Sequence, residues 1–367
     1  MIYNQLYLFL VLLCLLNPYV KRTQRYWPMY LGAFAVLCFQ ALRWKTGTDW
    51  IAYQNEFIYA GSDIWKSRME PGFELLNIIV RKYTSSYTVF LFVECGLNLF
   101  FITTFLRKMP INNPSLGMLY FFVIAIFPIR YTLASNMVLC SYFYILEKRF
   151  IPFLLLVLAA FTIHRTVIAF LPLYFICQRQ YSFKFLLILY FSCFVLGMLV
   201  EYTFGHILQM AMAMYGIASD TVQGKLEAYI TEDVPEYAKM TPMRVAMSLI
   251  NSTLFILFFR YFQVKRFSHD RLYALLFTLY VLGISFNRIF MQTVPDIARL
   301  TSLFTGGYII MIIMIIGSTK RTNQIFFTAA FTGYLFLTYN SSVHGFYEDL
   351  FVPYYSIFTE DPLRSLY

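Results

Sequence analysis

The sequence predicts an all-α polytopic membrane protein with about 12 transmembrane helices (about 10–12), some of them short or broken, and two larger external loops. Hydrophobic residues make up 59% of the 367 residues and charged residues only 13%, which is about half the charged share of a soluble domain. Long apolar runs recur along the chain, and basic residues gather in the short connectors between them. Composition, run length and charge placement therefore agree on a membrane protein.

The basic balance of the chain does not indicate nucleic-acid binding. The net charge of +10 is spread in twos and threes and forms no cationic stripe, so membrane topology explains it better and no nucleic-acid partner is predicted. All six cysteines lie in apolar segments without a C-x-x-C pair or a Cys/His cluster, which predicts no disulfide framework, no metal site and no cofactor. The first apolar stretch lacks a basic leader and a cleavage site, so we interpret it as a retained span.

The predicted spans are the runs of mostly apolar residues that cross, or nearly cross, a hydrocarbon core as helices. They lie at residues 3–20, 27–43, 87–106, 115–129, 131–146, 150–177, 183–200, 243–262, 272–290, 298–317 and 323–340. The Asn-Ser-Thr sequon at 251–253 falls within one of these spans and is not interpreted as a glycosylation site.

The run 150–177 is interrupted at its middle by His164 and Arg165, so it is either one helix with a mid-bilayer charge or two short spans that meet at a polar turn. The positive-inside rule favours two spans, because only then do all short basic connectors lie on one side. Each half would reach only ~20 Å, which requires a thinned or protein-lined region. The connectors contain Lys21, Arg22, Arg25, Arg107, Lys108, Lys148, Arg149, Arg179, Lys184, Arg260, Lys265, Arg266, Arg271, Lys320 and Arg321.

With two short spans, both termini lie outside and the longer loops share the outer face. These are the loops 44–86 and 201–242, a turn at 288–297 and the tail 341–367. Among the acidic residues only Glu147 and Asp270 fall on the basic side. No low-complexity tract, linker or repeat divides the chain, so residues 1–367 are predicted to form a single transmembrane domain.

Five arginines lie at the outer ends of spans, against the positive-inside bias. Lipid headgroups attract such side chains, so any one of them can simply snorkel. Five on one face instead indicate a cleft that binds a diphosphate, since the planar guanidinium fork matches phosphate oxygens. They are Arg43, Arg130, Arg165, Arg288 and Arg299.

The loop that follows the second span combines carboxylates with aromatic rings. Asp49 precedes Trp50 and Tyr53, and Glu70 precedes a Pro-Gly-Phe sequence. Rings beside carboxylates suit sugars, although interfacial aromatics are also typical of a bilayer surface. Asp49 can alternatively act only as the cap of a short interfacial helix.

His164 is a candidate functional residue because ionisable side chains within a membrane are expensive to keep there. A structural histidine at a polar turn is the alternative. Glu94 and Asn98, one turn apart, can hold the bundle together instead of acting on a substrate. The chain has no phosphate-binding P-loop, no dinucleotide fingerprint, no H-E-x-x-H motif and no serine nucleophile elbow. It also has no D-x-D on the inner face for a nucleotide-sugar and its metal.

These stretches resemble the EpsG family, a branch of the Wzy-like polysaccharide polymerases. The similarity runs in order through nearly the whole chain. It rests on Arg43, Gly47, Asp49 and Tyr53, on Glu70-Pro-Gly-Phe, on Ile129-Arg130 with Ala134, on residues 158–168 around His164, on Ile297-Ala-Arg299-Leu and on Val352-Pro-Tyr-Tyr. The chain departs from the family at Tyr131-Thr132, where the family often has a glutamine, and at Arg165, where it usually has a small or hydroxyl residue.

The resemblance implies a metal-independent membrane glycosyltransferase of the bacterial inner (cytoplasmic) membrane, with its active face outward. Such enzymes polymerise lipid-linked oligosaccharide repeat units into O-antigen, capsule or exopolysaccharide. The donor would be the growing glycan on undecaprenyl diphosphate and the acceptor a single lipid-linked unit. Membrane lipid and a chain-length regulator are the further partners that the resemblance suggests.

The chemistry assigns roles to the candidate residues. Arg43, Arg130 and Arg299 would stabilise charge on the leaving phosphate in place of a metal. Either His164 or Asp49 would take the acceptor proton, with His164 preferred because imidazole titrates nearest neutral pH. The predicted substrate-binding residues are Arg43, Glu70, Arg165, Arg288, Trp50 and Tyr53. A flippase for the same lipid-linked sugars is the alternative function, and it would need cations along a path between leaflets. A membrane acyltransferase lacks a partner motif, and a structural membrane subunit is the remaining possibility.

Overall fold

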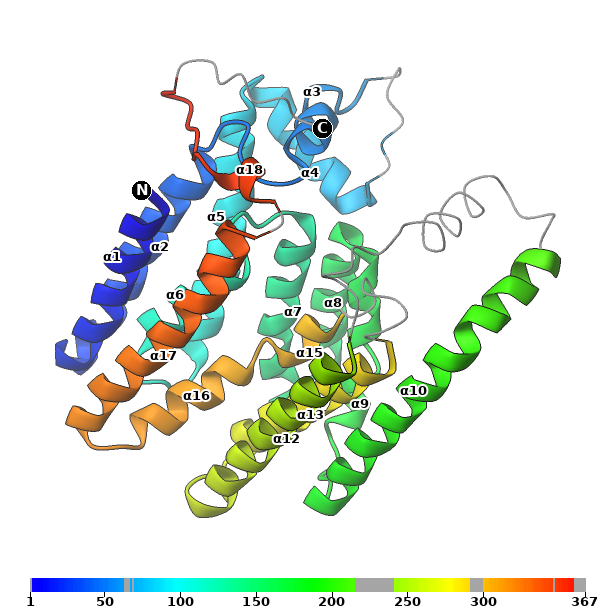
Figure 1. Cartoon of the computed structure of the whole chain (residues 1–367). Coiled ribbons are helices and arrows are strands. Elements are labelled where there is room, and N and C mark those ends of the chain that lie inside the picture. Colours follow the sequence, from blue (N-terminus) through cyan, green and yellow to red (C-terminus); the bar gives the residue numbers. More distant parts are fainter. Residues whose placement is uncertain are drawn as a thin grey trace. The chain divides into compact units, whose positions relative to one another are not determined.

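The structure is a computed structural model that describes residues 2–62, 67, 69–214, 241–290, 300–345 and 347–359. The chain divides into two compact units, and each is described by itself. Unit 1 comprises Met1–Gln178 and Gly306–Tyr367, and unit 2 comprises Arg179–Thr305 (Figure 1). Most of the predicted loop 201–242, the end of the predicted tail and Arg299 lie outside the described residues.

Several helices of unit 1 begin at or next to a proline, a residue that favours the first turn of a helix. Proline stands in the first turn of α2, α4 and α6, where its missing N–H costs nothing. The helices are α1 (Ile2–Leu16), α2 (Trp27–Ala41), α3 (Trp50–Ile58), α4 (Pro71–Tyr83), α5 (Tyr87–Lys108), α6 (Pro114–Ile124), α7 (Arg130–Leu146), α8 (Phe150–Ile163), the 3-10 helix η3 (Arg165–Phe170), α9 (Leu173–Ile176), α16 (Tyr308–Gly317), α17 (Arg321–Val343) and α18 (Glu348–Phe351).

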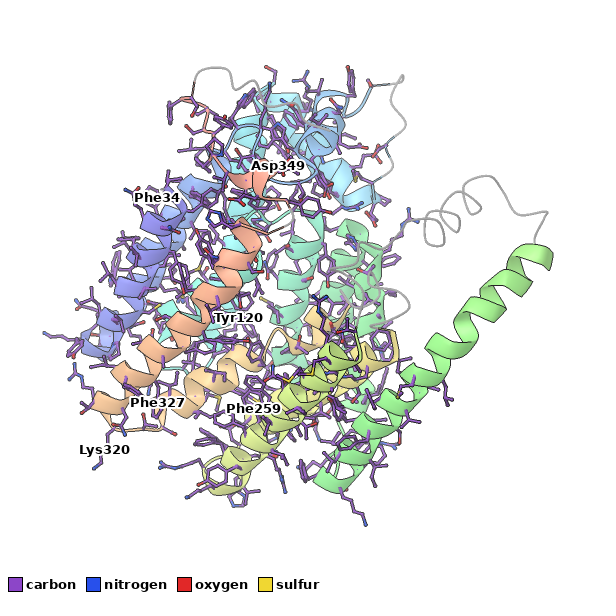
Figure 2. The ribbon with its side chains drawn as sticks, in the orientation of Figure 1. Phe34, Tyr120, Phe259, Lys320, Phe327 and Asp349 are labelled. Atoms are coloured by element: carbon purple, nitrogen blue, oxygen red, sulfur yellow. The ribbon has the colours of Figure 1, made fainter. Side chains whose placement is uncertain are left out.

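The core of unit 1 surrounds α6, whose residues from Pro114 to Val123 are all buried. A helix that is apolar on every side must be covered on every side. In unit 1 α6 is packed by α1, α2, α5, α16 and α17. The outer surfaces remain apolar, with Phe34 on α2 and Phe327 on α17 exposed (Figure 2). Such surfaces are expected where helices face lipid.

Unit 2 is organised around α13 (Arg271–Phe290), which packs against α10 (Phe183–Met214), α12 (Pro242–Lys265) and α15 (Thr301–Thr305). A close approach joins α10 to α13, because a Cβ at Gly197 would lie 2.1 Å from the carbonyl oxygen of Arg288. Only glycine permits that contact.

The prediction of an all-α membrane protein is confirmed at the level of helices. The described residues form no β-strand, only an isolated bridge between Arg43 and Ser356. In the described part of the chain, four helices are long and apolar enough to cross a membrane, at Ile2–Tyr19, Tyr87–Lys108, Met243–Lys265 and Arg271–Ile289. Shorter apolar helices coincide with the predicted spans at 27–43, 115–129, 150–177, 183–200 and 298–317. The count of twelve spans and the single domain stay predictions.

The structure confirms the break in 150–177. The helix α8 ends at Ile163, His164 has extended backbone angles, and η3 begins at Arg165. At three places the extents of the helices differ from the limits of the predicted spans and loops. The helix α10 continues to Met214, because the apolar run extends past 200 without a proline. The predicted span 298–317 is divided after Thr305, because Gly306 and Gly307 each disfavour helix by about 1 kcal/mol. The loop 44–86 is largely helical, since α3 and α4 lie within it.

Candidate active site

Glu70 stands immediately before α4, at the N-cap position, and Pro71 opens the helix. The start of α4 packs directly on the last turn of α8. A Cβ at Gly72 would lie 2.2 Å from Oγ1 and 2.9 Å from the carbonyl oxygen of Thr162, so no larger residue fits without a shift of the helices. The Glu-Pro-Gly sequence therefore brings the Glu70 carboxylate to the end of α8.

The Glu70 carboxylate joins three segments that are far apart in the sequence. One oxygen forms an ion pair with Nη1 of Arg130, the first residue of α7. The other oxygen accepts the backbone N–H of Arg165 at 3.1 Å, and Nε of Arg165 lies 3.8 Å from it. The Glu70 side chain is 8% exposed and that of Arg130 20%, whereas that of Arg165 is 73% exposed. Glu70 thus holds two cations at one place and leaves one guanidinium open to a ligand.

His164 lies beside this ion pair, in the extended turn between α8 and η3. Its Nδ1 is 2.7 Å from the hydroxyl of Thr166 and accepts the Thr166 backbone N–H at 3.4 Å. The ring of Tyr131 meets the imidazole edge to face at 5.2 Å between centroids. The break in the helix therefore presents an oriented imidazole next to Arg165.

The helix α3 contributes aromatic residues to the same cluster. Tyr53 packs against Phe73 and interacts with Arg130 through its hydroxyl. Burial raises the pKa of the Tyr53 phenol above its usual value, the positive charge of Arg130 opposes that rise, and Asp49 adds to it. Asp49 occupies the N-cap position of α3 with a left-handed backbone (φ 57°) but makes no side-chain capping bond. Its carboxylate is exposed, which disfavours the interpretation of Asp49 as a helix cap alone.

Among the candidate cations that the structure describes, Arg43 is the most deeply buried, at 2% exposure. Its guanidinium lies 4.6 Å from the ring of Phe127 and 5.6 Å from that of Trp50. Nε and Nη1 of Arg43 have no hydrogen-bond partner among the described residues. Cation–π contacts alone leave these donors unsatisfied, so Arg43 can still bind an anion that reaches it.

A series of buried polar side chains connects Arg43 to α7. Glu94 on α5 interacts electrostatically with the Arg43 guanidinium and accepts Nδ2 of Asn98 at 2.6 Å. Oδ1 of Asn98 in turn accepts Nδ2 of Asn136 on α7 at 2.9 Å. Glu94 and Asn98 therefore join α5 to α7, the helix that begins at Arg130, as their spacing suggested.

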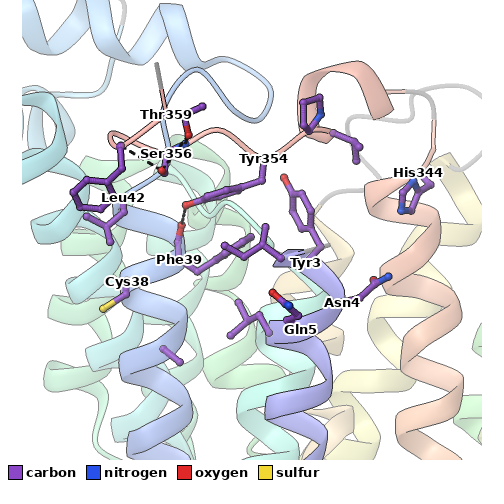
Figure 3. Close-up of a pocket in the computed structure, with 16 residues that line it drawn as sticks. Tyr3, Asn4, Gln5, Cys38, Phe39, Leu42, His344, Tyr354, Ser356 and Thr359 are labelled. Atoms are coloured by element: carbon purple, nitrogen blue, oxygen red, sulfur yellow. Dashed lines mark hydrogen bonds between the residues drawn. The ribbon is translucent and has the colours of Figure 1, made fainter. Parts of the chain in front are cut away.

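The closing segment of unit 1 folds back over the loop that carries Arg43. The N–H of Trp44 donates to the carbonyl of Tyr355 at 2.9 Å, and the N–H of Gly47 donates to that of Leu350 at 2.8 Å. A cavity of about 730 Å³ opens beside this seam, between Tyr3 and Gln5 of α1, Phe39 of α2 and the closing segment (Figure 3). Among the described residues that line it there is no lysine or arginine, so it is not suited to a diphosphate.

Two predicted site residues are not among the described residues of unit 1. Arg288 belongs to unit 2, where its guanidinium donates to the hydroxyls of Ser248 and Ser252 on α12 and lies over the ring of Tyr190. These contacts join α12 to α13, a role that the outer-face interpretation of Arg288 did not include. Arg299 lies outside the described residues. The structure therefore brings together Glu70, Arg130, His164, Arg165 and Tyr53. Trp50, on the same helix as Tyr53, lies next to the Arg43 guanidinium.

The segments that meet at Glu70 are the ones on which the family resemblance rests. A model of the EpsG family matches residues 26–356, about nine-tenths of the chain. The chain belongs to the EpsG family. Neither the curated proteins nor the solved structures contain a match.

Two contacts of the EpsG-family cluster were not predicted as site residues. Thr166 holds Nδ1 of His164, and Tyr131 covers the imidazole. In the sequence Tyr131 stands out only as a departure from the family pattern, and its position one residue after Arg130 is the signal that could have identified it. In the described part of the chain, no group of three His, Cys, Asp or Glu side chains is placed to hold a metal ion.

Proposed function

We propose that this EpsG-family protein is a polysaccharide repeat-unit polymerase. It transfers a growing glycan from undecaprenyl diphosphate to a lipid-linked oligosaccharide repeat unit at the outer face of the bacterial cytoplasmic membrane. Family membership supports an exopolysaccharide or O-antigen polymerase type of membrane protein. The cluster around Glu70 supports the transferase chemistry.

The observation that carries the proposal is the placement of two arginines and a histidine by one carboxylate. Glu70 binds Nη1 of Arg130 with one carboxylate oxygen and the backbone N–H of Arg165 with the other. Nε of Arg130 is buried without a partner among the described residues, and the Arg165 guanidinium is mostly exposed. Fixed guanidinium donors suit the phosphate oxygens of a departing lipid diphosphate.

The transfer exchanges one bond to the anomeric carbon for another. The bond from that carbon to the diphosphate oxygen breaks, and the electron pair leaves with the lipid diphosphate, where Arg130, Arg165 and Arg299 stabilise the charge. The acceptor hydroxyl oxygen forms the new glycosidic bond and gives its proton to a base. Tyr53, which is partly exposed, supplies ring surface beside the sugars. Trp50 is 2% exposed and instead packs against the Arg43 guanidinium and the ring of Tyr87.

The base is His164 or Asp49. The contacts of His164 determine which of its ring nitrogens carries a proton and therefore whether Nε2 can accept one. A proton on Nδ1 that is donated to the Thr166 hydroxyl leaves Nε2 free to accept the acceptor proton. The backbone N–H of Thr166 can only donate, so its 3.4 Å contact favours the other tautomer, in which Nε2 is a donor. We favour His164 as the base, with the hydroxyl contact as the stronger of the two because it is shorter.

The protein's topology in this proposal has twelve spans with both termini and the candidate site outside. The acceptor and donor then meet the site from the outer leaflet, with membrane lipid around the helices and a chain-length regulator as a partner. No nucleotide-sugar enters the reaction, because the glycosyl donor is already lipid-linked.

Purified protein incubated with lipid diphosphate oligosaccharide alone tests the proposal. We expect a ladder of longer lipid-linked glycans without any nucleotide-sugar, and EDTA should leave the ladder intact. Proteoliposomes that move the lipid-linked sugar between leaflets, but never produce a ladder, would establish the flippase instead.

A further inference from the structure

The helix α12 of unit 2 has one face that packs inside the unit. Ile256 and Phe259 are fully buried, and the Phe259 carbonyl accepts the hydroxyl of Tyr273 on α13 at 3.0 Å. One and two turns earlier on the same side, Ser252 and Ser248 bind the guanidinium of Arg288. At 100° per residue these positions form a single stripe along the helix.

A second stripe lies on the far side of α12 from this contact, and all of it is exposed. Met247, Leu254, Phe258 and Tyr261 are 41–59% exposed. Together with Asn251 they are spaced by four and three residues in alternation, which is the 3.5-residue repeat of a helix–helix seam. This helix is also the least buried of the four candidate spans, with 11% of its apolar window buried.

Asn251 places an amide in the middle of that seam. The side chain is exposed and makes no hydrogen bond to any described residue. Its neighbours differ, because the hydroxyls of Ser252 and Thr253 donate to carbonyls of their own helix at 2.9 and 2.8 Å. Asn251 lies about 12 Å along the helix from Met243, too far for its short side chain to reach water from mid-span. An unpaired amide in hydrocarbon is costly, so this position calls for a polar partner.

We propose that two copies of this chain associate through α12, with Asn251 of one copy hydrogen-bonded to Asn251 of the other. An amide is both donor and acceptor, so the residue is complementary to itself. Copies inserted in the same orientation present parallel α12 helices, in which identical seam positions face each other. Met247, Leu254 and Phe258 then pack around the amide pair. This inference does not rest on the proposed function.

Association is measured on full-length protein in liposomes by single-molecule photobleaching, over a series of protein-to-lipid ratios. We expect a monomer–dimer equilibrium, and Asn251→Leu should weaken dimerisation about 3- to 30-fold, the usual worth of an interhelical polar pair. Asn251→Gln keeps donor and acceptor and should retain the dimer. Thr253→Val is the matched control, since its hydroxyl bonds to its own helix, and should leave the equilibrium unchanged.

Cross-linking in native membranes tests the seam itself. In a background in which the six free cysteines are replaced, Leu254→Cys should form a disulfide-linked dimer, and Ile256→Cys, at a fully buried position, should not. A wild-type protein that stays monomeric at every ratio overturns the proposal, and so does a dimer that Asn251→Leu does not weaken. A monomer that Asn251→Leu destabilises would show that the amide is paired within its own chain.

Discussion

At the scale of single residues, the shape of the guanidinium matters as much as its charge. Arg130 gives one donor to Glu70 and keeps others for a ligand, an arrangement that the single ammonium of lysine cannot reproduce. Arg130→Lys should therefore lower polymer formation by about 100-fold while the amount of protein in the membrane is unchanged. We expect the same direction for Arg299→Lys. Polymer length on gels and immunoblots of membranes measure the two quantities.

Arg149→Lys is the matched control. Arg149 also pairs with a glutamate, Glu147, but both side chains are more than half exposed, and surface pairs of this kind contribute little. It should leave the polymer unchanged. Wild-type chain length in Arg130→Lys would show that this arginine only reaches for lipid headgroups.

The choice between the two candidate bases is also decided at single residues. If His164 takes the acceptor proton, His164→Ala should lower the rate by about 10²–10⁴-fold and Asp49→Asn should cost less. The wild-type rate should rise with pH through the range in which imidazole loses its proton, because only the neutral ring can accept one. Initial rates of ladder formation over a pH series measure both effects.

Thr166→Val refines that experiment. It removes the hydroxyl 2.7 Å from Nδ1 of His164 but keeps the backbone N–H of residue 166. The tautomer with the proton on Nε2, which cannot accept a proton there, therefore becomes more populated. A rate that falls about tenfold would support His164 as the base. A near-normal rate in His164→Ala, together with an inactive Asp49→Asn, would reverse the assignment and leave His164 as a structural residue.

At the scale of elements, the contact between α4 and α8 sets the position of Glu70. Gly72→Ala places a methyl group against Thr162, including its backbone oxygen, so the two helices must separate. We expect a strain of about 1–3 kcal/mol and a clear loss of activity, because Glu70 moves relative to Arg130. Gly96→Ala is the control, since a Cβ there meets nothing within 4 Å. Equal activity of the two variants would contradict the role of this contact.

Helix extents could be predicted from the sequence far better than contacts. The apolar runs and the polar interruption at His164 give the helices and the break, because those features are local. The pairing of Glu70 with Arg130 depends on tertiary packing across 60 residues, which no local pattern encodes. For the same reason the sequence does not reveal that Arg288, predicted as a substrate ligand, bonds to Ser248 and Ser252, which lie one turn apart on the neighbouring helix α12.

At the scale of the whole molecule, the distribution of basic residues between the two sides of the membrane determines the topology. Within unit 1, Lys320 lies at one end of α17 and Asp349 beyond the other (Figure 2). The segment that follows Asp349 bonds to residues 42–47, next to Arg43. The basic connector and the candidate site are thus associated with opposite ends of one helix.

The last prediction follows from this polarity. In a cysteine-free background, Asp349→Cys should react with a membrane-impermeant maleimide in intact cells, and Lys320→Cys should react only after the cells are opened. Both side chains are exposed, so access differs only by side of the membrane. Cysteines at position 225 should be labelled from outside and at position 179 from inside. Two short spans in 150–177 return the chain to the cytoplasmic side before residue 179, and the next span then brings residue 225 to the outside. Label that reaches 225 only from the cytoplasm would mean that 150–177 crosses once, and it would place the second long loop away from the candidate site.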